Sequence, residues 1–230
     1  MEELLKEDLK WCLTRLPKDV IDILKKEGNK VLVSGGYLRS CIANEEIRDI
    51  DIFTKNKETS LRLAELLQTK RPDKKIYKTE YAYTVKGFMY PIQFIHKWIF
   101  KNPIECIESF DFTIAKSALW FDRITETWNG ICDKRFYPDL SAKRLVYCSP
   151  IRNEEAGGSI LRVLKFYQRG YRIPLDSMGK VIARLVKGVD LEKSAINTDN
   201  DWDEELLSSV FFGLLKEVDP ATDPNHLGHL

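Results

Sequence analysis

The stretch VLVSGGYLRSCIANEEIRDIDIF, residues 31–53, carries the strongest structural signal in the chain. It begins with a short apolar run, Val31–Val33, which predicts a strand. Two adjacent glycines, Gly35 and Gly36, follow this run and precede a helical pattern. A second run, Ile47–Phe53, alternates apolar and charged residues and predicts another strand. The expected local order is therefore strand, glycine turn, helix and strand.

Two aspartates, Asp49 and Asp51, lie inside the second predicted strand. Alternate residues of a strand point to the same face, so the two carboxylates should lie side by side, about 7 Å apart along the strand. Neighbouring carboxylates repel each other unless a cation lies between them. Mg²⁺ is bound by carboxylates together with substrate phosphate oxygens, which suits this pair. The alternative is a solvated strand face that carries Arg48, Asp49 and Asp51.

The glycine pair favours a phosphate-binding turn. Glycines allow the backbone to approach a phosphate closely, and the following helix would present its first N–H groups to an anion. Ser34 adds a hydroxyl group and Arg39 adds a positive charge. The alternative for Ser34–Gly36 is an ordinary tight turn.

Composition restricts the class of protein. The chain has 230 residues, of which 43% are hydrophobic and 31% charged, as in a globular protein. Its net charge is +1, so any nucleic-acid surface must be local. The five cysteines form no C-x-x-C pair, which favours reduced thiols in a cytoplasmic protein. No apolar run reaches the roughly 18 residues of a membrane span, and no secretory signal is expected.

The chain changes character near residue 150. The first part mixes predicted helices and strands and ends in a polar, turn-rich stretch after residue 122. From residue 158 the pattern is helical, and residues 158–187 contain seven basic residues and one acidic residue. Residues 190–205 are acidic. We therefore expect one domain over 1–150 and a helical region over 151–230.

Four motifs in order resemble one family. GGYLR followed by DID is similar to the nucleotidyltransferase head of class II CCA-adding enzymes and bacterial poly(A) polymerases, in the DNA polymerase β-like superfamily. The resemblance continues through DFTIAKSALWF (111–121), FYPDLSAKRLVY (136–147) and ILRVLKFYQRGY (160–171). It implies an α/β fold: a polymerase-β-like head with a mixed or antiparallel sheet, followed by a helical neck.

The resemblance also implies an activity. It is the metal-dependent, template-independent transfer of a nucleoside monophosphate from a nucleoside triphosphate to a hydroxyl group. Asp49 and Asp51 would be catalytic and would hold Mg²⁺ or Mn²⁺. The residues expected to bind the nucleotide are Ser34, Gly35, Gly36, Arg39, Asp111, Arg162 and Lys165.

The acceptor is expected to be an RNA 3′ end. Arg169 and Arg172 would bind it, and their spacing from Arg162 and Lys165 puts all four on one broad face of the predicted neck helix. Two alternatives stay open. One is a toxin or phage-defence enzyme that modifies a protein or makes a nucleotide product. The other is a non-catalytic nucleotide- or RNA-binding module. No membrane partner is expected, and the oligomeric state is open.

Several positions depart from the family pattern. Ser40 replaces an aspartate, and Ser109 and Phe110 replace the two arginines that precede Asp111. Gln93 occupies the strand on which related enzymes with three carboxylates place the third. The base-reading motif E-D-x-x-R has no match in TDNDWDEELL (198–207), and no body or tail for tRNA follows the neck. A tRNA CCA-adding enzyme is therefore not expected.

Overall fold

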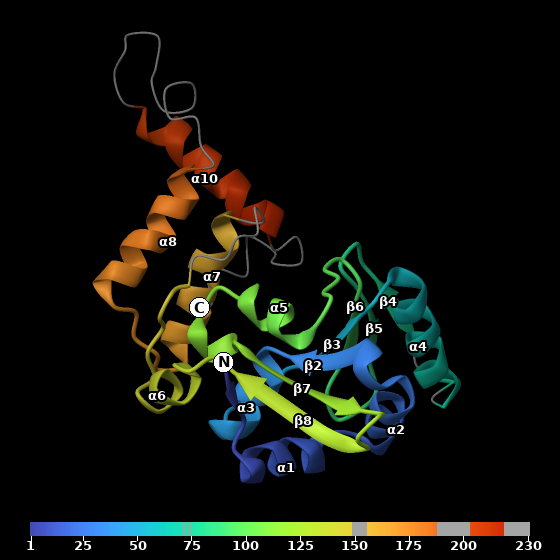
Figure 1. Cartoon of the computed structure of the whole chain (residues 1–230). Helices are drawn as coiled ribbons and strands as arrows, with labels where there is room; N and C mark the ends of the chain where they lie inside the picture. Colours follow the sequence, from blue (N-terminus) through green and yellow to red (C-terminus); the bar gives the residue numbers. More distant parts are fainter. Residues whose placement is uncertain (71, 74, 149–155, 188–202, 219–230) are drawn as a thin grey trace. The chain divides into compact units, whose positions relative to one another are not determined.

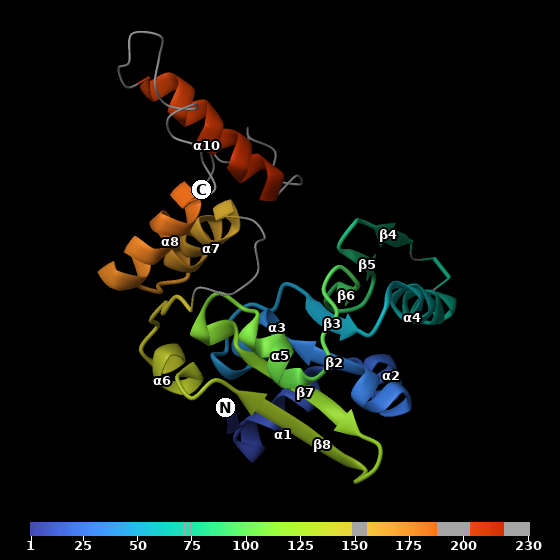
Figure 2. The same ribbon diagram turned by 45° about the horizontal axis from the view of Figure 1, so that its top comes forward.

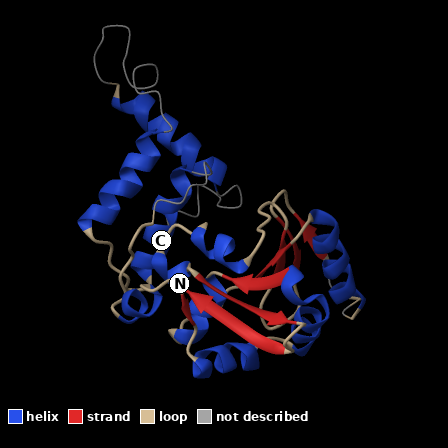
Figure 3. Cartoon of the chain, in the orientation of Figure 1, coloured by secondary structure: helices blue, strands red, loops and turns tan. Residues whose placement is uncertain are grey.

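A computed structural model describes residues 1–70, 72–73, 75–148, 156–187 and 203–218. The chain divides into two compact units, Met1–Ala142 and Lys143–Leu230. Within the described ranges, the eight named strands all belong to the first unit (Figure 3). The predicted division near residue 150 falls in a segment outside the described residues and stays a prediction. Most of the acidic stretch 190–205 also lies outside the described residues.

The first unit is built on an eight-stranded mixed sheet with the order β1-β8-β7-β2-β3-β6-β5-β4 (Figure 1). Neighbouring strands are antiparallel, except that β3 and β6 are parallel. The strands are β1 (Glu2–Glu3), β2 (Val31–Ser34), β3 (Ile50–Thr54), β4 (Ile76–Lys78), β5 (Ala82–Val85), β6 (Ile92–Ile95), β7 (Ser117–Asp122) and β8 (Thr127–Cys132).

Helices cover both faces of this sheet, with α5 on one side and α1 and α2 on the other (Figure 2). The helices of this unit are α1 (Lys6–Arg15), α2 (Lys18–Glu27), α3 (Gly36–Ile42), α4 (Lys57–Thr69), α5 (Pro103–Glu108) and α6 (Phe136–Ser141), with short 3-10 turns η1 (Gly28–Lys30) and η2 (Thr113–Ala115). Among the described residues, no helix is both long and apolar enough to span a bilayer.

Strand alternation gives the two faces of the sheet different roles. Ile50 and Ile52 of β3 are fully buried, as is Phe94 of β6, and their face is packed throughout. The opposite face carries an apolar cluster that includes Phe53 and, from α5, Ile107. Asp51 points to this same face because it is two residues from Phe53. We call the face that carries Asp51 and Phe53 the carboxylate face.

The sequence prediction was wrong at two places in the first unit. The stretch after residue 122 contains β8 and α6 rather than turns alone, because β8 completes a six-residue pairing with β7 and Phe121 packs edge-on to Trp128. Gly130 obscured this strand: a Cβ there would lie 2.7 Å from Leu4, so the glycine makes room for the N-terminal segment. The segment KIYKTEYAYTV (75–85), whose apolar and aromatic residues predict a single strand, forms two antiparallel strands, β4 and β5.

The second unit is helical in its described part and contains α7 (Ala156–Gln168), α8 (Leu175–Lys187) and α10 (Glu204–Val218). Gly170 follows α7 with a φ of +84°, and its N–H donates to the Tyr167 carbonyl, which is a typical helix end. Arg169 and Arg172 therefore lie beyond α7. The prediction that they share one helix face with Arg162 and Lys165 was wrong for this reason.

Candidate active site

The two aspartates lie where β3 begins. Asp51 is the second residue of β3 and is partly buried between the fully buried Ile50 and Ile52. Asp49 immediately precedes the strand, so the prediction that both aspartates lie within one regular strand was wrong. The regular strand cannot begin earlier because the pairing of β2 with β3 ends at Ile52 and that of β6 with β3 ends at Ile50.

Gln93 on β6 lies next to both aspartates and bonds one of them. It lies directly opposite Asp51 in the parallel ladder between β3 and β6. Its side-chain Nε2 donates a hydrogen bond of 3.1 Å to Oδ2 of Asp49. The sequence indicated that Gln93 occupies a strand next to the site but did not reveal this bond, because a pairing between residues 42 positions apart has no local signal.

The glycine turn lies beside Asp51. The antiparallel register of β2 and β3 pairs Val33 with Ile52, and continuing it by one residue brings Ser34 opposite Asp51. The turn is fixed by the carbonyl of Ser117 on β7. This oxygen accepts one hydrogen bond from Ser34 Oγ (2.7 Å) and another from the Gly35 N–H (3.2 Å). The predicted roles of Ser34 and Gly35 in nucleotide binding stay predictions.

The two glycines differ in their structural requirement. Gly35 has a φ of +81°, and a Cβ on it would lie 3.3 Å from the ring of Phe110. Gly36 is the first residue of α3, and a Cβ there would meet only ordinary contacts, the nearest at 3.7 Å to Nη2 of Arg39. Backbone conformation therefore requires glycine at position 35 but not at position 36.

Arg39 lies next to the turn and is buried, with 6% of its surface exposed. Its guanidinium group lies 3.6 Å from the Glu45 carboxylate and donates a 3.0 Å hydrogen bond to Ser40 Oγ. Sequence analysis missed Glu45 because the residue comes from the loop after α3 rather than from a recognised motif. The positive charge of Arg39 is thus balanced by Glu45 within the protein. The phosphate-binding role of Arg39 stays a prediction.

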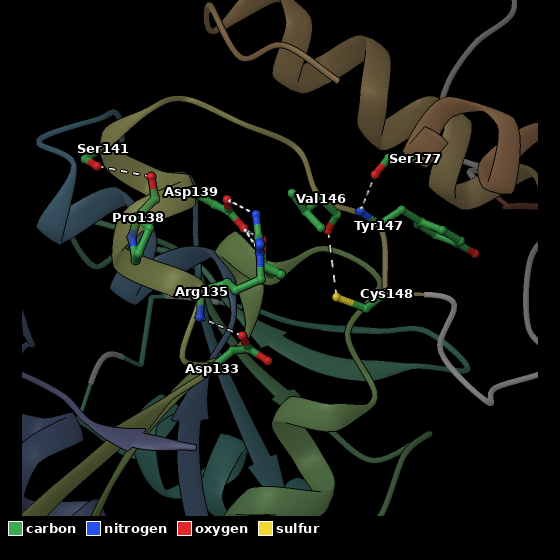
Figure 4. Close-up of polar contacts among 10 residues, drawn as sticks. Asp133, Arg135, Pro138, Asp139, Ser141, Val146, Tyr147, Cys148 and Ser177 are labelled. Carbon is green, nitrogen blue, oxygen red and sulfur yellow. Dashed lines mark hydrogen bonds and ion pairs between the residues drawn. The ribbon is translucent and has the colours of Figure 1, made fainter. Parts of the chain in front are cut away.

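Two of the recognised motifs are tied together by a buried carboxylate (Figure 4). Asp139 of α6 is almost completely buried and accepts a 2.7 Å hydrogen bond from Thr113 Oγ1 of the DFTIA motif. It also accepts two bonds from Arg135, at 3.1 and 2.9 Å. This network fixes the segment that begins at Asp111, which is itself buried. The nucleotide-binding role of Asp111 is not tested by this arrangement.

Burial, and next the charge of Asp49, raise the pKa of the Asp51 carboxyl well above its usual range. Two carboxylates held together at such a cost are typical of a cation site. Within the described ranges, no group of three or more acidic, histidine or cysteine side chains could hold a metal ion. The two aspartate carboxylates would fit Mg²⁺, since this ion keeps several waters and also binds substrate phosphates.

The predicted neck residues belong to the second unit. Arg162 and Lys165 are both exposed on α7, whereas Val163 and Phe166 on the same helix are buried. Their predicted role in nucleotide use stays a prediction. Most of the stretch 198–207 lies outside the described residues.

The glycine turn allows a paired test. We expect Gly35→Ala to lower the melting temperature by several degrees, because a side chain at positive φ costs about 1–2 kcal/mol and this one would also press on Phe110. Gly36→Ala should keep the melting temperature within about 2 °C, since alanine suits the start of a helix. If the turn binds phosphate, Gly36→Ala should weaken nucleoside triphosphate binding, measured by calorimetry; unchanged affinity would assign the turn a purely structural role.

The sequence matches the family described as Gad2, Gabija anti-defense 2 family protein, over residues 3–143. A curated relative from Bacillus phage SPbetaL7, "Gabija anti-defense 2", is 26% identical over 172 residues. That alignment covers 73% of this chain and 40% of the phage protein, so this chain spans about two fifths of its relative's length.

Solved CCA-adding enzymes share the fold. A complex of the Thermotoga maritima CCA-adding enzyme with tRNA matches with a TM-score of 0.58 and 17% identity, over 97% of this chain and 57% of that one. A CCA-adding enzyme in complex with CTP gives a TM-score of 0.61, also at 17% identity, over 97% and 52% of the two chains. The sheet and its helices thus have the nucleotidyltransferase head fold, in agreement with the fold expected from the motifs.

Proposed function

The chain belongs to the Gabija anti-defense 2 family, and we propose that its head is a metal-dependent nucleotidyltransferase. In this proposal it transfers a nucleoside monophosphate from a nucleoside triphosphate to a hydroxyl acceptor and releases pyrophosphate. The observation that carries the proposal is the placement of Asp49 and Asp51 beside the glycine turn, with Gln93 bonded to Asp49. We infer further that the head is of the type found in class II CCA-adding enzymes and poly(A) polymerases.

Asp49 and Asp51 would hold the divalent cation, Mg²⁺ or Mn²⁺. When bound, the cation would polarise the α-phosphate of the nucleotide and neutralise charge that develops on the leaving pyrophosphate. The protein's own part is to position and to stabilise charge. Gln93 keeps the Asp49 carboxylate in one orientation. Because the Gly35 N–H is already bonded to Ser117, the N–H groups left for a phosphate begin at Gly36.

A solvated strand face explains these residues less well. A carboxyl group on such a face keeps an ordinary pKa, whereas burial and the neighbouring charge raise that of Asp51. Gln93 also commits its amide to one of the two carboxylates. A purely structural site would be more stable with an amide or apolar residue at position 51. This is the ground for preferring an enzyme to a binding module that has lost its chemistry.

The family name attaches an anti-defense role to its members, and we propose that the transfer reaction serves that role here. The acceptor would then be a hydroxyl group on an RNA 3′ end, since one fold relative is a CCA-adding enzyme in complex with tRNA, or on a protein of the defense system. The first is our preferred acceptor because residues 143–148 and 156–187 of the second unit are strongly basic, as argued in the next subsection.

The proposal is tested by product analysis. The purified chain is incubated with each of the four α-³²P-labelled ribonucleoside triphosphates and Mg²⁺, with total RNA or with host protein extract as acceptor. RNA, protein and free nucleotides are then separated. Label in RNA or in protein that requires the cation supports transfer and identifies the acceptor.

The matched control is the same incubation with Asp49→Asn and with EDTA. Label that persists in both controls would come from a contaminating enzyme. If no label moves to any acceptor, although the protein binds the triphosphate in a cation-dependent way, the binding-module alternative replaces the enzyme.

A further inference from the structure

A group of basic residues converges in the second unit from two distant parts of the sequence. Arg144 and Arg172 form a parallel β-bridge. The Leu145 N–H donates to the Arg172 carbonyl and the Arg172 N–H to the Lys143 carbonyl, each at 2.8 Å. Lys143 Nζ in turn lies 3.2 Å from the carbonyl of Arg169. We call Lys143, Arg144, Arg169 and Arg172 the basic bridge.

The basic bridge is fixed rather than a set of independent charges on a helix. Three hydrogen bonds join its two segments: two between backbone groups and one from Lys143 Nζ. The backbone also turns at Gly170, directly after α7. Lys143 has a φ of +47°, a conformation that costs energy for a lysine. The side chains of Arg144 and Arg172 are both exposed.

Aromatic rings interleave with these charges. The Arg172 guanidinium lies 4.8 Å from the ring centroid of Tyr167, and Lys143 Nζ lies 5.8 Å from that of Tyr171. Tyr171 is fully buried and so belongs to the core of this unit, but Tyr167 is 58% exposed. An exposed ring held by an arginine offers a flat surface on which a base can stack.

The chain around the basic bridge carries mostly positive charge. The described residues 143–148 and 156–187 contain nine basic residues and one acidic residue, Asp176. The described start of α10 is acidic instead, with Asp203, Glu204 and Glu205, so the excess of positive charge is local to these two ranges. A protein surface of this kind would attract a polyanion and release its counterions.

We propose that the basic bridge and Tyr167 bind single-stranded nucleic acid, with the arginines on phosphates and Tyr167 against a base. A single strand is favoured over a duplex because the bases of a duplex are already stacked and cannot reach Tyr167. The inference rests on the proposed function only in naming the strand as the acceptor. Binding itself requires neither the cation nor the nucleotide.

The test uses fluorescein-labelled oligouridine and the full chain in EDTA, with binding followed by fluorescence anisotropy over a series of KCl concentrations. Arg144→Glu with Arg172→Glu should weaken binding at least tenfold and reduce the slope of log K against log[KCl] by about 1.4, or about 0.7 for each lost phosphate contact. The control is Lys180→Glu with Lys187→Glu, which changes the charge equally on exposed residues of α8 and should cause a much smaller loss.

Stacking has its own test. Tyr167→Ala should weaken binding about tenfold with an unchanged salt slope, whereas Tyr167→Phe should bind as the wild type does. Equal losses in the bridge and control pairs would overturn the proposed surface, as would oligouridine binding that does not respond to salt. If circular dichroism shows that the two glutamates unfold the unit, the test is repeated with Arg144→Gln and Arg172→Gln. Because the assay contains no nucleoside triphosphate and no free divalent cation, loss of binding is distinguished from loss of catalysis.

Discussion

Asp51→Asn is expected to change activity and stability in opposite directions. The rate of nucleotidyl transfer should fall on the order of a thousandfold, which corresponds to about 4 kcal/mol of lost charge stabilisation. The melting temperature of the metal-free protein at pH 8 should rise by about 2–4 °C, the shift that about 1 kcal/mol produces in a chain of this size. A residue kept for folding alone cannot give this combination.

The direction of the stability effect follows from the raised pKa of Asp51. At a pH below the ordinary pKa of an aspartate, about 3.8, the carboxyl group is protonated in the folded and the unfolded protein, and the asparagine variant has no advantage. As the pH rises, the unfolded chain loses this proton first, so folding becomes less favourable. The destabilisation is complete once the pH exceeds the folded pKa, and asparagine removes it.

The measurement is a thermal melt of both proteins in EDTA from pH 4 to pH 8, paired with the labelled-nucleotide assay. Asp22→Asn is the control, since Asp22 is exposed on α2 and loses the same charge. It should leave the transfer rate unchanged and shift the melting temperature little at any pH. Retained activity in Asp51→Asn would remove the residue from the mechanism. A lower melting temperature at pH 8 would contradict the destabilising effect of a partly buried carboxylate beside Asp49.

Much of the head could be predicted because its signals are local. The helices on either side of Pro17, the strand at Val31 and the helix over residues 58–69 follow from periodicity and end signals within a few residues of each element. The order of the motifs then indicated the fold, which the solved CCA-adding enzymes share. In each case the information lies within one short segment.

The remaining features depend on contacts between distant segments. β8 was missed because its pairing with β7 and the fit of Leu4 against Gly130 determine it. The pairing of Arg39 with Glu45 depends on the path of the loop after α3. The basic residues after α7 continue the helical spacing, and a single glycine such as Gly170 is only a weak end signal in a sequence. Their partner Arg144 lies 28 residues earlier, beyond the reach of any local pattern.

Gln93 depends on both a local signal and a contact between distant segments. Its strand could be predicted, but its bond to Asp49 required the parallel pairing of β3 with β6. A glutamine here has a physical advantage over a third carboxylate. Burial already raises the pKa of Asp51, and another negative charge opposite it would raise this pKa further. The amide instead donates to Asp49 and adds no charge.

We therefore expect Gln93→Leu to reduce the transfer rate by about 10–100-fold, the usual effect of removing a group that orients a metal ligand. The apparent affinity for Mn²⁺, titrated by activity and by the rise in melting temperature that the ion causes, should fall as well. Thr84→Val is the matched control, since Thr84 lies opposite Gln93 in β5, whereas the hydrogen bond to Asp49 comes from Gln93.

The opposite change, Gln93→Glu, separates orientation from simple packing. It keeps the size of the side chain but replaces the N–H donor with a charge, so the metal-free protein should melt at a lower temperature at pH 8 than the wild type. Added Mn²⁺ should then raise its melting temperature by more than it raises that of the wild type, because the cation relieves a larger repulsion. A packing role predicts the same response to Mn²⁺ in Gln93→Leu, Gln93→Glu and the wild type, and that result would remove Gln93 from the site.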